Sequence, residues 1–225
     1  MEQRELFSIG EAGPSRLTRE VIARKLAAGF DPRGRSDSAL EALVDGGAVR
    51  PGERVDDDSL TPAAVLVPLV ERPEGLVIML TKRTAHLAHH PGQISFPGGR
   101  LEDADKGNLT TCALRETEEE TGLDRQLVRI LGRLDDYVTG TGFVVTPIVG
   151  VIDPPFTLAP DSFEVAEVFE VPLAFVLDQA NHQLQRREVK GRQRPFWAMT
   201  WEDKLIWGAT AGILVNLSEV LAAIE

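Results

Sequence analysis

The chain has 225 residues and a formal net charge of -11, from 35 acidic and 24 basic side chains. A negative field of this kind repels a phosphate backbone, which argues against nucleic acid as a partner. The 43% of hydrophobic and 26% of charged residues are typical of a globular protein and argue against fibrous or disordered architecture. A small anionic substrate stays compatible with this charge, because a bound divalent cation inverts the local field at one site.

Cys112 is the only cysteine, so an intramolecular disulfide is impossible and a reducing compartment is favoured. Its expected role is that of a small core residue. The first 20 residues lack a basic-then-apolar signal pattern, and no run approaches 18 apolar residues. We therefore expect a cytoplasmic protein without membrane association.

The organisation predicted is one main domain, 61–225, with an N-terminal extension, 1–60. The extension is polar, with two amphipathic stretches at 17–30 and 38–43 and breaks at Asp31-Pro32 and Arg50-Pro51-Gly52. It carries no motif, and we expect it to pack on the main domain or on a partner.

The main domain begins with two apolar runs, 63–70 and 76–81, which predict a hairpin of buried strands around a 71–75 turn. A Gly/Pro-rich loop then precedes a helix at 109–121. The further elements expected are strands at 128–137 and 144–152, a short helix at 173–179, strands at 183–188 and 195–201, and a closing helix at 206–224. This mixture predicts an α+β or α/β sandwich.

The helix at 109–121 carries an acidic cluster. Glu116, Glu119 and Glu120 are spaced i, i+3, i+4, so they share a sector of about 100°. Glu118 projects away from them. The same sector is apolar earlier in the helix, at Leu109, Cys112 and Ala113.

Two interpretations of this acidic face are open. Most glutamate-rich helix faces are simply solvated. Here, however, like charges at helical spacing cost about 0.2–0.5 kcal/mol per pair, and Arg115 is the one cation in the stretch. A bound metal would relieve the repulsion better, and Mg²⁺ takes a few carboxylates together with waters and substrate phosphates.

Zinc is disfavoured, because no His/Cys cluster stands at metal-binding spacing. The histidines are too scattered, and we expect them to be ordinary surface or substrate-loop residues. They are His86, His89, His90 and His182.

The loop before the helix contains Phe96-Pro97-Gly98-Gly99. Paired glycines let a backbone approach a ligand closely, so a carbonyl could point at the metal, although an isolated Pro-Gly-Gly is usually a plain turn. Residues 99–123 resemble the Nudix box, whose core is Arg-Glu-(apolar)-x-Glu-Glu-x-Gly-(apolar). The positions that match are Arg115, Glu116, Glu119, Glu120, Gly122 and Leu123.

Two features depart from the box. Thr117 stands where an aliphatic residue is usual, and the interval from Gly99 to Arg115 is two residues longer, with Asp105 or Glu102 as the acidic residue of the loop. The resemblance implies an α/β/α sandwich with a mixed sheet. It also implies that Mg²⁺ or Mn²⁺ is held by Glu116, Glu119 and Glu120 with help from the Gly99 carbonyl, and that Arg115 orients the cluster by ion pairing.

A second segment, 80–99, reads Leu-Thr-Lys-Arg-Thr-Ala-His-Leu-Ala-His-His-Pro-Gly-Gln-Ile-Ser-Phe-Pro-Gly-Gly. It is similar to the coenzyme A pyrophosphatase signature, Leu-Leu-Thr-x-Arg-(Ser/Ala)-x3-Arg-x3-Gly-x3-Phe-Pro-Gly-Gly. Thr84 replaces the small residue and Ala88 replaces the second arginine, which removes one cation. Agreement continues at 139–150, 164–173 and 206–214, so the resemblance spans about 63–221.

The resemblance implies metal-dependent hydrolysis of the diphosphate of coenzyme A to 3',5'-ADP and 4'-phosphopantetheine. Candidate general bases are Glu119, Glu120, or a later acid such as Glu164 or Glu167. Arg83 and Lys82 are the expected phosphate contacts, since a guanidinium fork matches phosphate oxygens, although a strand-end cation can also be merely solvated.

Two alternatives remain open. The chain could hydrolyse ADP-ribose, a dinucleotide or a nucleoside triphosphate with the same helix, or it could be a regulatory module that binds a nucleotide without cleaving it. The intact box glutamates argue against the regulatory module. A homodimer and a monomer are both compatible with the sequence.

Overall fold

The computed structural model describes residues 17–31, 34–44, 60–87, 91–189 and 191–223. Its main sheet has nine strands in the described chain, and β2 pairs in parallel with β8 but antiparallel with β3, so the sheet is mixed. The strands are β1 (Arg35–Ser36), β2 (Thr61–Arg72), β3 (Gly75–Arg83), β4 (Ile94–Ser95), β5 (Gly98–Arg100), β6 (Val128–Arg133), β7 (Tyr137–Val138), β8 (Phe143–Ile152) and β9 (Val165–Pro172).

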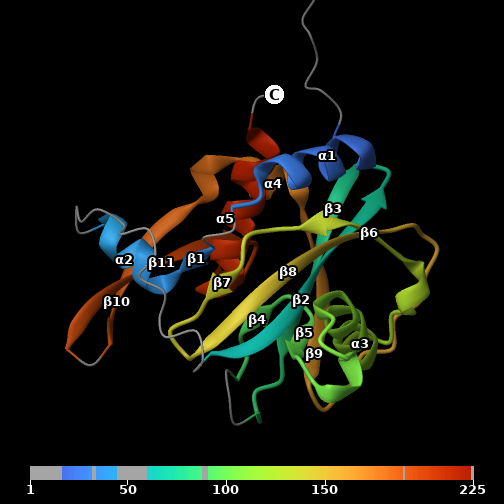
Figure 1. Cartoon of the computed structure of the whole chain (residues 1–225), viewed down its shortest axis with the longest axis horizontal. Coiled ribbons are helices and arrows are strands. Elements are labelled where there is room, and N and C mark those ends of the chain that lie inside the picture. The colour runs from blue at the N-terminus through green and yellow to red at the C-terminus, as the bar shows by residue number, and fades with distance from the viewer. Residues whose placement is uncertain (1–16, 32–33, 45–59, 88–90, 190, 224–225) are drawn as a thin grey trace, which may run out of the picture.

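Helices cover both faces of this sheet (Figure 1). On one face α3 (Leu109–Thr121) packs through Cys112 and Ala113 against Ala64 and Leu66 of β2. The other face carries α1 (Arg19–Gly29), α4 (Leu173–Leu177) and α5 (Ala209–Ala222), which share the largest apolar core. The predicted α/β/α sandwich with a mixed sheet is therefore confirmed.

The predicted hairpin is present and tighter than expected. Arg72 pairs with Gly75, so only two residues connect β2 to β3. Successive residues of β3 alternate between the two faces of the sheet: Met79 belongs to the core on the α3 side, whereas Ile78 and Leu80 belong to the core under α5. This alternation decides where the end of β3 directs its side chains.

The strand predicted at 128–137 is interrupted. β6 ends at Arg133 and β7 begins at Tyr137, although both pair with β8. Between them the buried Asp135 leaves the ladder: its N–H donates to Asn216 Oδ1 at 3.1 Å, and its carboxylate accepts from Arg35 Nε at 3.0 Å. Polar contacts across the molecule thus replace strand pairing here.

A second sheet contains β10 (Gln183–Val189), β11 (Arg192–Trp201) and β12 (Lys204–Trp207), and its β10–β11 hairpin projects from the body (Figure 1). The closing helix predicted from residue 206 starts later, because Ile206 pairs with Met199 in this sheet. Gly208, at φ 66°, separates β12 from α5. Ile224 lies outside the described residues.

The described part of the N-terminal extension packs on the main domain. Ile22 and Leu26 of α1 are buried in the core with α5, and Arg35 and Ser36 pair in parallel with Tyr137 and Val138. Helix α2 (Asp37–Val44) follows directly. The break at Arg50-Pro51-Gly52 and the residue Pro32 lie outside the described residues, and the division at residue 60 stays a prediction.

No helix in the described ranges is long and apolar enough to cross a membrane.

Candidate active site on helix α3

Helix α3 has the bounds that the sequence predicts. Asn108 Oδ1 accepts from the Thr111 N–H at 3.0 Å at its start, and Gly122 ends it in the left-handed conformation at φ 70°. Its face toward β5 carries Glu116 and the buried Glu120, whereas the side chain of Glu119 is 58% exposed. Glu118 projects away, as expected, and accepts from Arg125 Nε at 2.6 Å.

The paired glycines bring the loop backbone against these carboxylates. A Cβ at Gly99 would lie 2.4 Å from Cδ of Glu116, so no other residue leaves room for that carboxylate. The Gly98 N–H donates to Glu120 Oε2 at 3.3 Å. The close backbone approach expected of Gly98-Gly99 is thus an approach to the two glutamates as well as to β2.

Glu120 is a buried carboxylate with few compensating partners. Burial raises its pKa to about 8, and the nearby Glu116 and Glu164 add to the rise, while the Gly98 N–H and Arg83 oppose it. Arg83 Nη1 lies 3.7 Å from Glu120 Oε1. Burial likewise raises the pKa of Glu116, against the effect of Arg115. The surroundings of both glutamates therefore disfavour their ionised forms.

Arg115 connects the helix to the preceding loop. Its Nε and Nη2 donate to the two carboxylate oxygens of buried Asp105, at 2.9 and 3.0 Å, and its Nη1 lies 3.0 Å from an oxygen of Glu116 and of Glu119. The bond from Arg115 holds the pKa of Asp105 down at about 2. Of the two loop acids left open by the sequence, Asp105 is the one paired with Arg115, and Arg115 contacts two of the box glutamates.

The two cations predicted to contact phosphate point to opposite faces of the sheet. Arg83 lies on the α3 side, beside Glu120. Lys82 lies on the same face of the sheet as Leu80, near the β11–β12 turn. There the hydrogen bond from Lys204 lowers the pKa of Asp203, and the positive charge of Lys82 lowers it further. The structure brings only Arg83 to the glutamates.

The two later acids are also separated. The Asp161 N–H donates to the Glu120 carbonyl at 3.0 Å, which fixes the loop before β9 at the end of α3 and places Glu164 close enough to raise the pKa of Glu120. Glu167 instead lies 3.3 Å from Lys204 Nζ. Glu164 is therefore at the site and Glu167 is not.

The donor chemistry fits a hard divalent cation, because carboxylate and carbonyl oxygens are its ligands and Gly99 leaves the space that Glu116 fills. Within the described ranges, however, no three acidic, histidine or cysteine side chains converge closely enough to hold a metal ion. Two of the box carboxylates already contact a cation, since Arg115 Nη1 lies 3.0 Å from an oxygen of Glu116 and of Glu119. Metal binding would have to replace these contacts by coordination.

Thr117 and Cys112 are buried side chains of α3, and each donates a hydrogen bond to a backbone carbonyl. The Thr117 hydroxyl donates to the Ala113 carbonyl at 2.7 Å, so a polar residue is tolerated where the box has an aliphatic one. Cys112 is fully buried, as predicted, and its thiol donates to the Arg100 carbonyl at 3.2 Å. Burial raises the pKa of Cys112 to about 11, so it is not a nucleophile at neutral pH.

The loop 159–164 is the part of the site that local sequence patterns miss. It reaches the box through backbone bonds from Ala159 to Thr121 and from Asp161 to Glu120. In the sequence, only the agreement with the family at 164–173 pointed toward this loop. Among the histidines, His86 lies in this neighbourhood, His182 contacts the Val176 carbonyl, and His89 and His90 lie outside the described residues.

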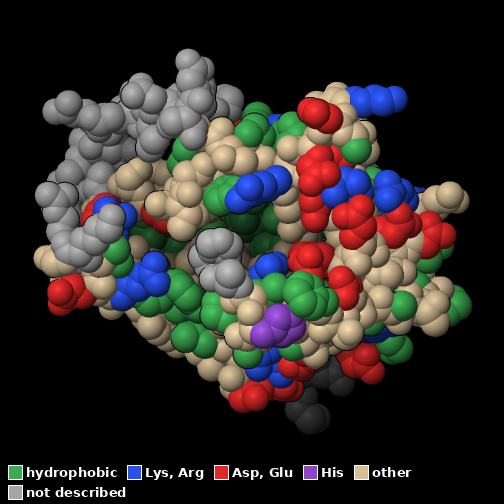
Figure 2. Space-filling view, turned by 90° about the horizontal axis from the view of Figure 1, so that it is seen from below, with side chains coloured by type: hydrophobic (Ala, Val, Ile, Leu, Met, Phe, Trp, Pro, Cys, Tyr) green, Lys and Arg blue, Asp and Glu red, His purple; other side chains and the backbone are tan. Residues whose placement is uncertain are grey.

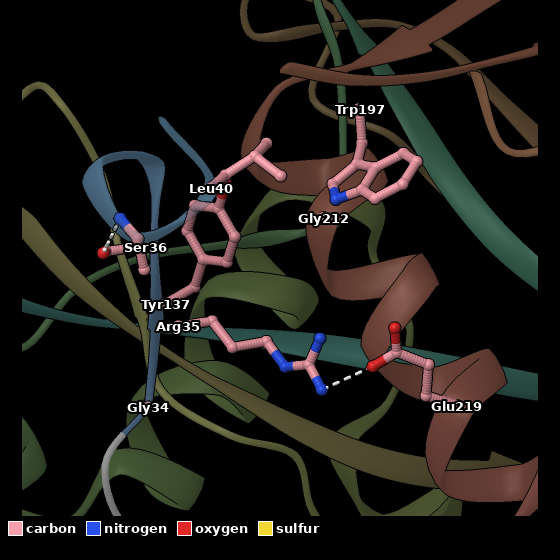
Figure 3. A pocket seen from close by; sticks show the side chains of 9 residues that line it. Gly34, Arg35, Ser36, Leu40, Tyr137, Trp197, Gly212 and Glu219 are labelled. Atoms are coloured by element: carbon pink, nitrogen blue, oxygen red, sulfur yellow. Dashed lines mark hydrogen bonds and ion pairs between the residues drawn. The ribbon is translucent and has the colours of Figure 1, made fainter. Parts of the chain in front are cut away.

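A separate cavity of about 180 Å³ lies between the N-terminal elements and α5 (Figure 3). Arg35 and Glu219 form an ion pair of 2.6 Å in its wall, which Tyr137, Leu40 and Trp197 complete. The cavity lies on the α5 face of the sheet, opposite α3.

Figure 2 shows one face of the molecule in space-filling form. On this face, a hollow that contains hydrophobic side chains lies beside a group of acidic side chains.

The fold and the glutamate helix together define a hydrolase of the Nudix class. The NUDIX domain family matches residues 60–195, and the chain belongs to this family. It is 38% identical over 169 residues to "Uncharacterized Nudix hydrolase NudL" of Photorhabdus laumondii, covering 75% of this chain and 89% of the relative. A protein of the same name from Cronobacter sakazakii is 42% identical over 157 residues, covering 69% and 80%.

Among solved structures, a Nudix hydrolase from M. smegmatis, RenU, is similar, with 22% identity, a TM-score of 0.44, and coverage of 52% of this chain and 74% of that chain.

Proposed function

We propose that this Nudix hydrolase cleaves the diphosphate of coenzyme A or its derivatives to 3',5'-ADP and 4'-phosphopantetheine. One observation carries the proposal. Arg83, which matches the first arginine of the coenzyme A signature, lies 3.7 Å from the buried Glu120 of the box. An arginine of the signature segment therefore lies beside a glutamate of the box.

In this proposal Glu116, Glu119 and Glu120 hold Mg²⁺ or Mn²⁺, with the Gly99 carbonyl as a further oxygen donor. When bound, the metal polarises phosphate oxygens and lowers the pKa of water. Asp105 fixes Arg115, and Arg115 positions Glu116 and Glu119.

The protein's other groups act on the substrate directly. Arg83 would pair with diphosphate oxygens through its guanidinium fork, since its present partner, Glu120, is beyond hydrogen-bond distance. Glu164 and the box glutamates are the candidates for taking a proton from the attacking water. Lys82 would reach the substrate only from the other face of the sheet, so we assign it the weaker contact.

Product analysis by mass spectrometry tests the proposal. Purified wild-type protein is incubated with coenzyme A and Mg²⁺. A second reaction contains EDTA, and a third contains the Glu120→Gln variant in place of wild type. Formation of 3',5'-ADP and 4'-phosphopantetheine only with metal and intact Glu120 supports both reaction and site. If coenzyme A is not cleaved under any of these conditions, the proposal that it is the substrate is wrong.

A second candidate keeps the chemistry and changes the substrate. Ala88 stands where the coenzyme A signature has its second arginine, and one cation fewer favours a substrate such as ADP-ribose, a dinucleotide or a nucleoside triphosphate. Coenzyme A cleavage no faster than ADP-ribose cleavage would favour this alternative. For either substrate we expect a cytoplasmic enzyme, as a monomer or a homodimer.

A further inference from the structure

Phe163 is an unusually exposed aromatic residue beside the candidate site. Its relative exposure of 64% is the highest among the large hydrophobic side chains in the described part of the chain. Its ring is tilted by 59° against the ring of His86, with 4.8 Å between the centroids. Single exposed hydrophobic residues are common on surfaces, so exposure alone assigns no function. The position and anchoring of this pair carry the argument.

The backbone around the pair is fixed by three hydrogen bonds. The Phe163 N–H donates to Asp161 Oδ1 at 2.9 Å, the Thr84 hydroxyl donates to the Phe163 carbonyl at 2.8 Å, and the Thr84 N–H donates to the Glu164 carbonyl at 2.9 Å. The two bonds from Thr84 join the end of β3 to the loop before β9, and the first bond lies within that loop. Phe163 is thus exposed and also preorganised, which lowers the entropic cost of binding a ligand.

The same two segments reach the box. Arg83, directly before Thr84, lies 3.7 Å from Glu120, and the Asp161 N–H binds the carbonyl of Glu120. The aromatic pair therefore extends from the same two backbone segments as Arg83 and Asp161, which contact Glu120, one of the carboxylates proposed to act on the diphosphate. Any group that binds on the pair lies close to that diphosphate.

We propose that Phe163 and His86 form a stacking platform for the purine base of the nucleotide half of the substrate. This inference rests on the proposed diphosphatase function and holds for any adenine nucleotide cleaved at this site. In such a nucleotide only a ribose separates the base from the phosphates, so the base must bind near Arg83. An aromatic ring face suits a base and contributes about 1–3 kcal/mol per base stacked. The base is uncharged, so the net negative charge of the protein does not repel it.

The test compares two ligands that differ only by the base. AMP and ribose 5-phosphate are titrated calorimetrically into the full chain with Mg²⁺, using wild type, Phe163→Ala, Phe163→Trp and Leu205→Ala. Leu205, 47% exposed on β12, is the matched control for loss of an exposed hydrophobic side chain. Thermal unfolding of each variant checks the fold, which we expect to survive because the Phe163 side chain contributes little to the core.

Wild type should bind AMP more tightly than ribose 5-phosphate by about 5- to 150-fold, the range that corresponds to one stacked base. Phe163→Ala should remove this preference without weakening ribose 5-phosphate, while Phe163→Trp and Leu205→Ala should keep it. An undiminished AMP preference in Phe163→Ala overturns the platform, as does equal binding of both ligands by wild type. Because no turnover is measured, failure of the platform is separate from failure of coenzyme A hydrolysis.

Discussion

Asp105 and Arg115 form a two-point ion pair that joins the loop after β5 to helix α3, with Nε–Oδ1 and Nη2–Oδ2 distances of 2.9 and 3.0 Å. Asp105 is buried, and the same guanidinium contacts Glu116 and Glu119. The pair therefore fixes the arginine that positions two of the proposed metal ligands. A polar group outside the acidic cluster thus determines the geometry within it.

Replacing Asp105 by Asn should destabilise the protein by about 3–5 kcal/mol, because it leaves Arg115 without its buried countercharge. Urea unfolding of wild type and variant at pH 7 measures the difference. The folded-state pKa of Asp105, about 2, lies below its ordinary value of 3.8, so its stabilising effect is present above about pH 4 and is lost as the pH falls through about 2. The difference in the free energy of unfolding between wild type and variant should become smaller over that acidic range. A difference independent of pH would contradict the ion pair between Asp105 and Arg115 as its cause.

The box glutamates should differ from their neighbour on the same helix. Glu119→Gln and Glu120→Gln should lower kcat by about 10²–10⁴, the usual range for loss of a group that assists proton transfer, and should raise the Mg²⁺ concentration needed for activity. Glu118→Gln is the matched control, since Glu118 pairs with Arg125 on the other side of α3. Steady-state rates across a Mg²⁺ titration measure the effect. Full activity in both box variants would show that the metal and catalytic assignments are wrong.

The two cations at the end of β3 should contribute unequally. Arg83→Ala should lower kcat/KM by about tenfold to a hundredfold, in line with the roughly 1.5–3 kcal/mol of a charged hydrogen bond, because Arg83 lies beside Glu120. Lys82→Ala should change kcat/KM much less, since its side chain lies on the opposite face. Kinetics with coenzyme A and ADP-ribose measure both variants. An equal loss in the two would mean that the substrate contacts both faces of the sheet.

Gly99 should be intolerant of even a methyl group. A Cβ there would lie 2.4 Å from the Glu116 carboxyl carbon, so Gly99→Ala should displace that side chain and weaken metal binding. We expect at least a tenfold rise in the Mg²⁺ concentration for half-maximal activity, with circular dichroism unchanged. The double variant Gly99→Ala, Glu116→Ala provides the control: once Glu116 is absent, the glycine substitution should have little additional effect. Independent, additive losses would contradict the steric explanation.

The sequence by itself determined the elements whose signals are local. The i, i+3, i+4 spacing of Glu116, Glu119 and Glu120 identified the acidic face of α3, and the paired glycines indicated a close backbone approach. Alternating and continuous apolar runs placed β2, β3 and β8. Helical and strand periodicity depend only on neighbours along the chain, so these elements could be predicted without knowledge of the fold.

The tertiary structure alone decided what depends on pairing between distant segments. The packing of α3 on the sheet placed Arg83 with Glu120 and left Lys82 on the other face, and hydrogen bonds over long sequence separations brought Glu164 and Phe163 to the box. At shorter range, the pairing of Ile206 with Met199 in the β11–β12 hairpin shortened the closing helix. Contacts of this kind carry no local sequence period, because their partners are chosen by the packing of sheets and loops in three dimensions.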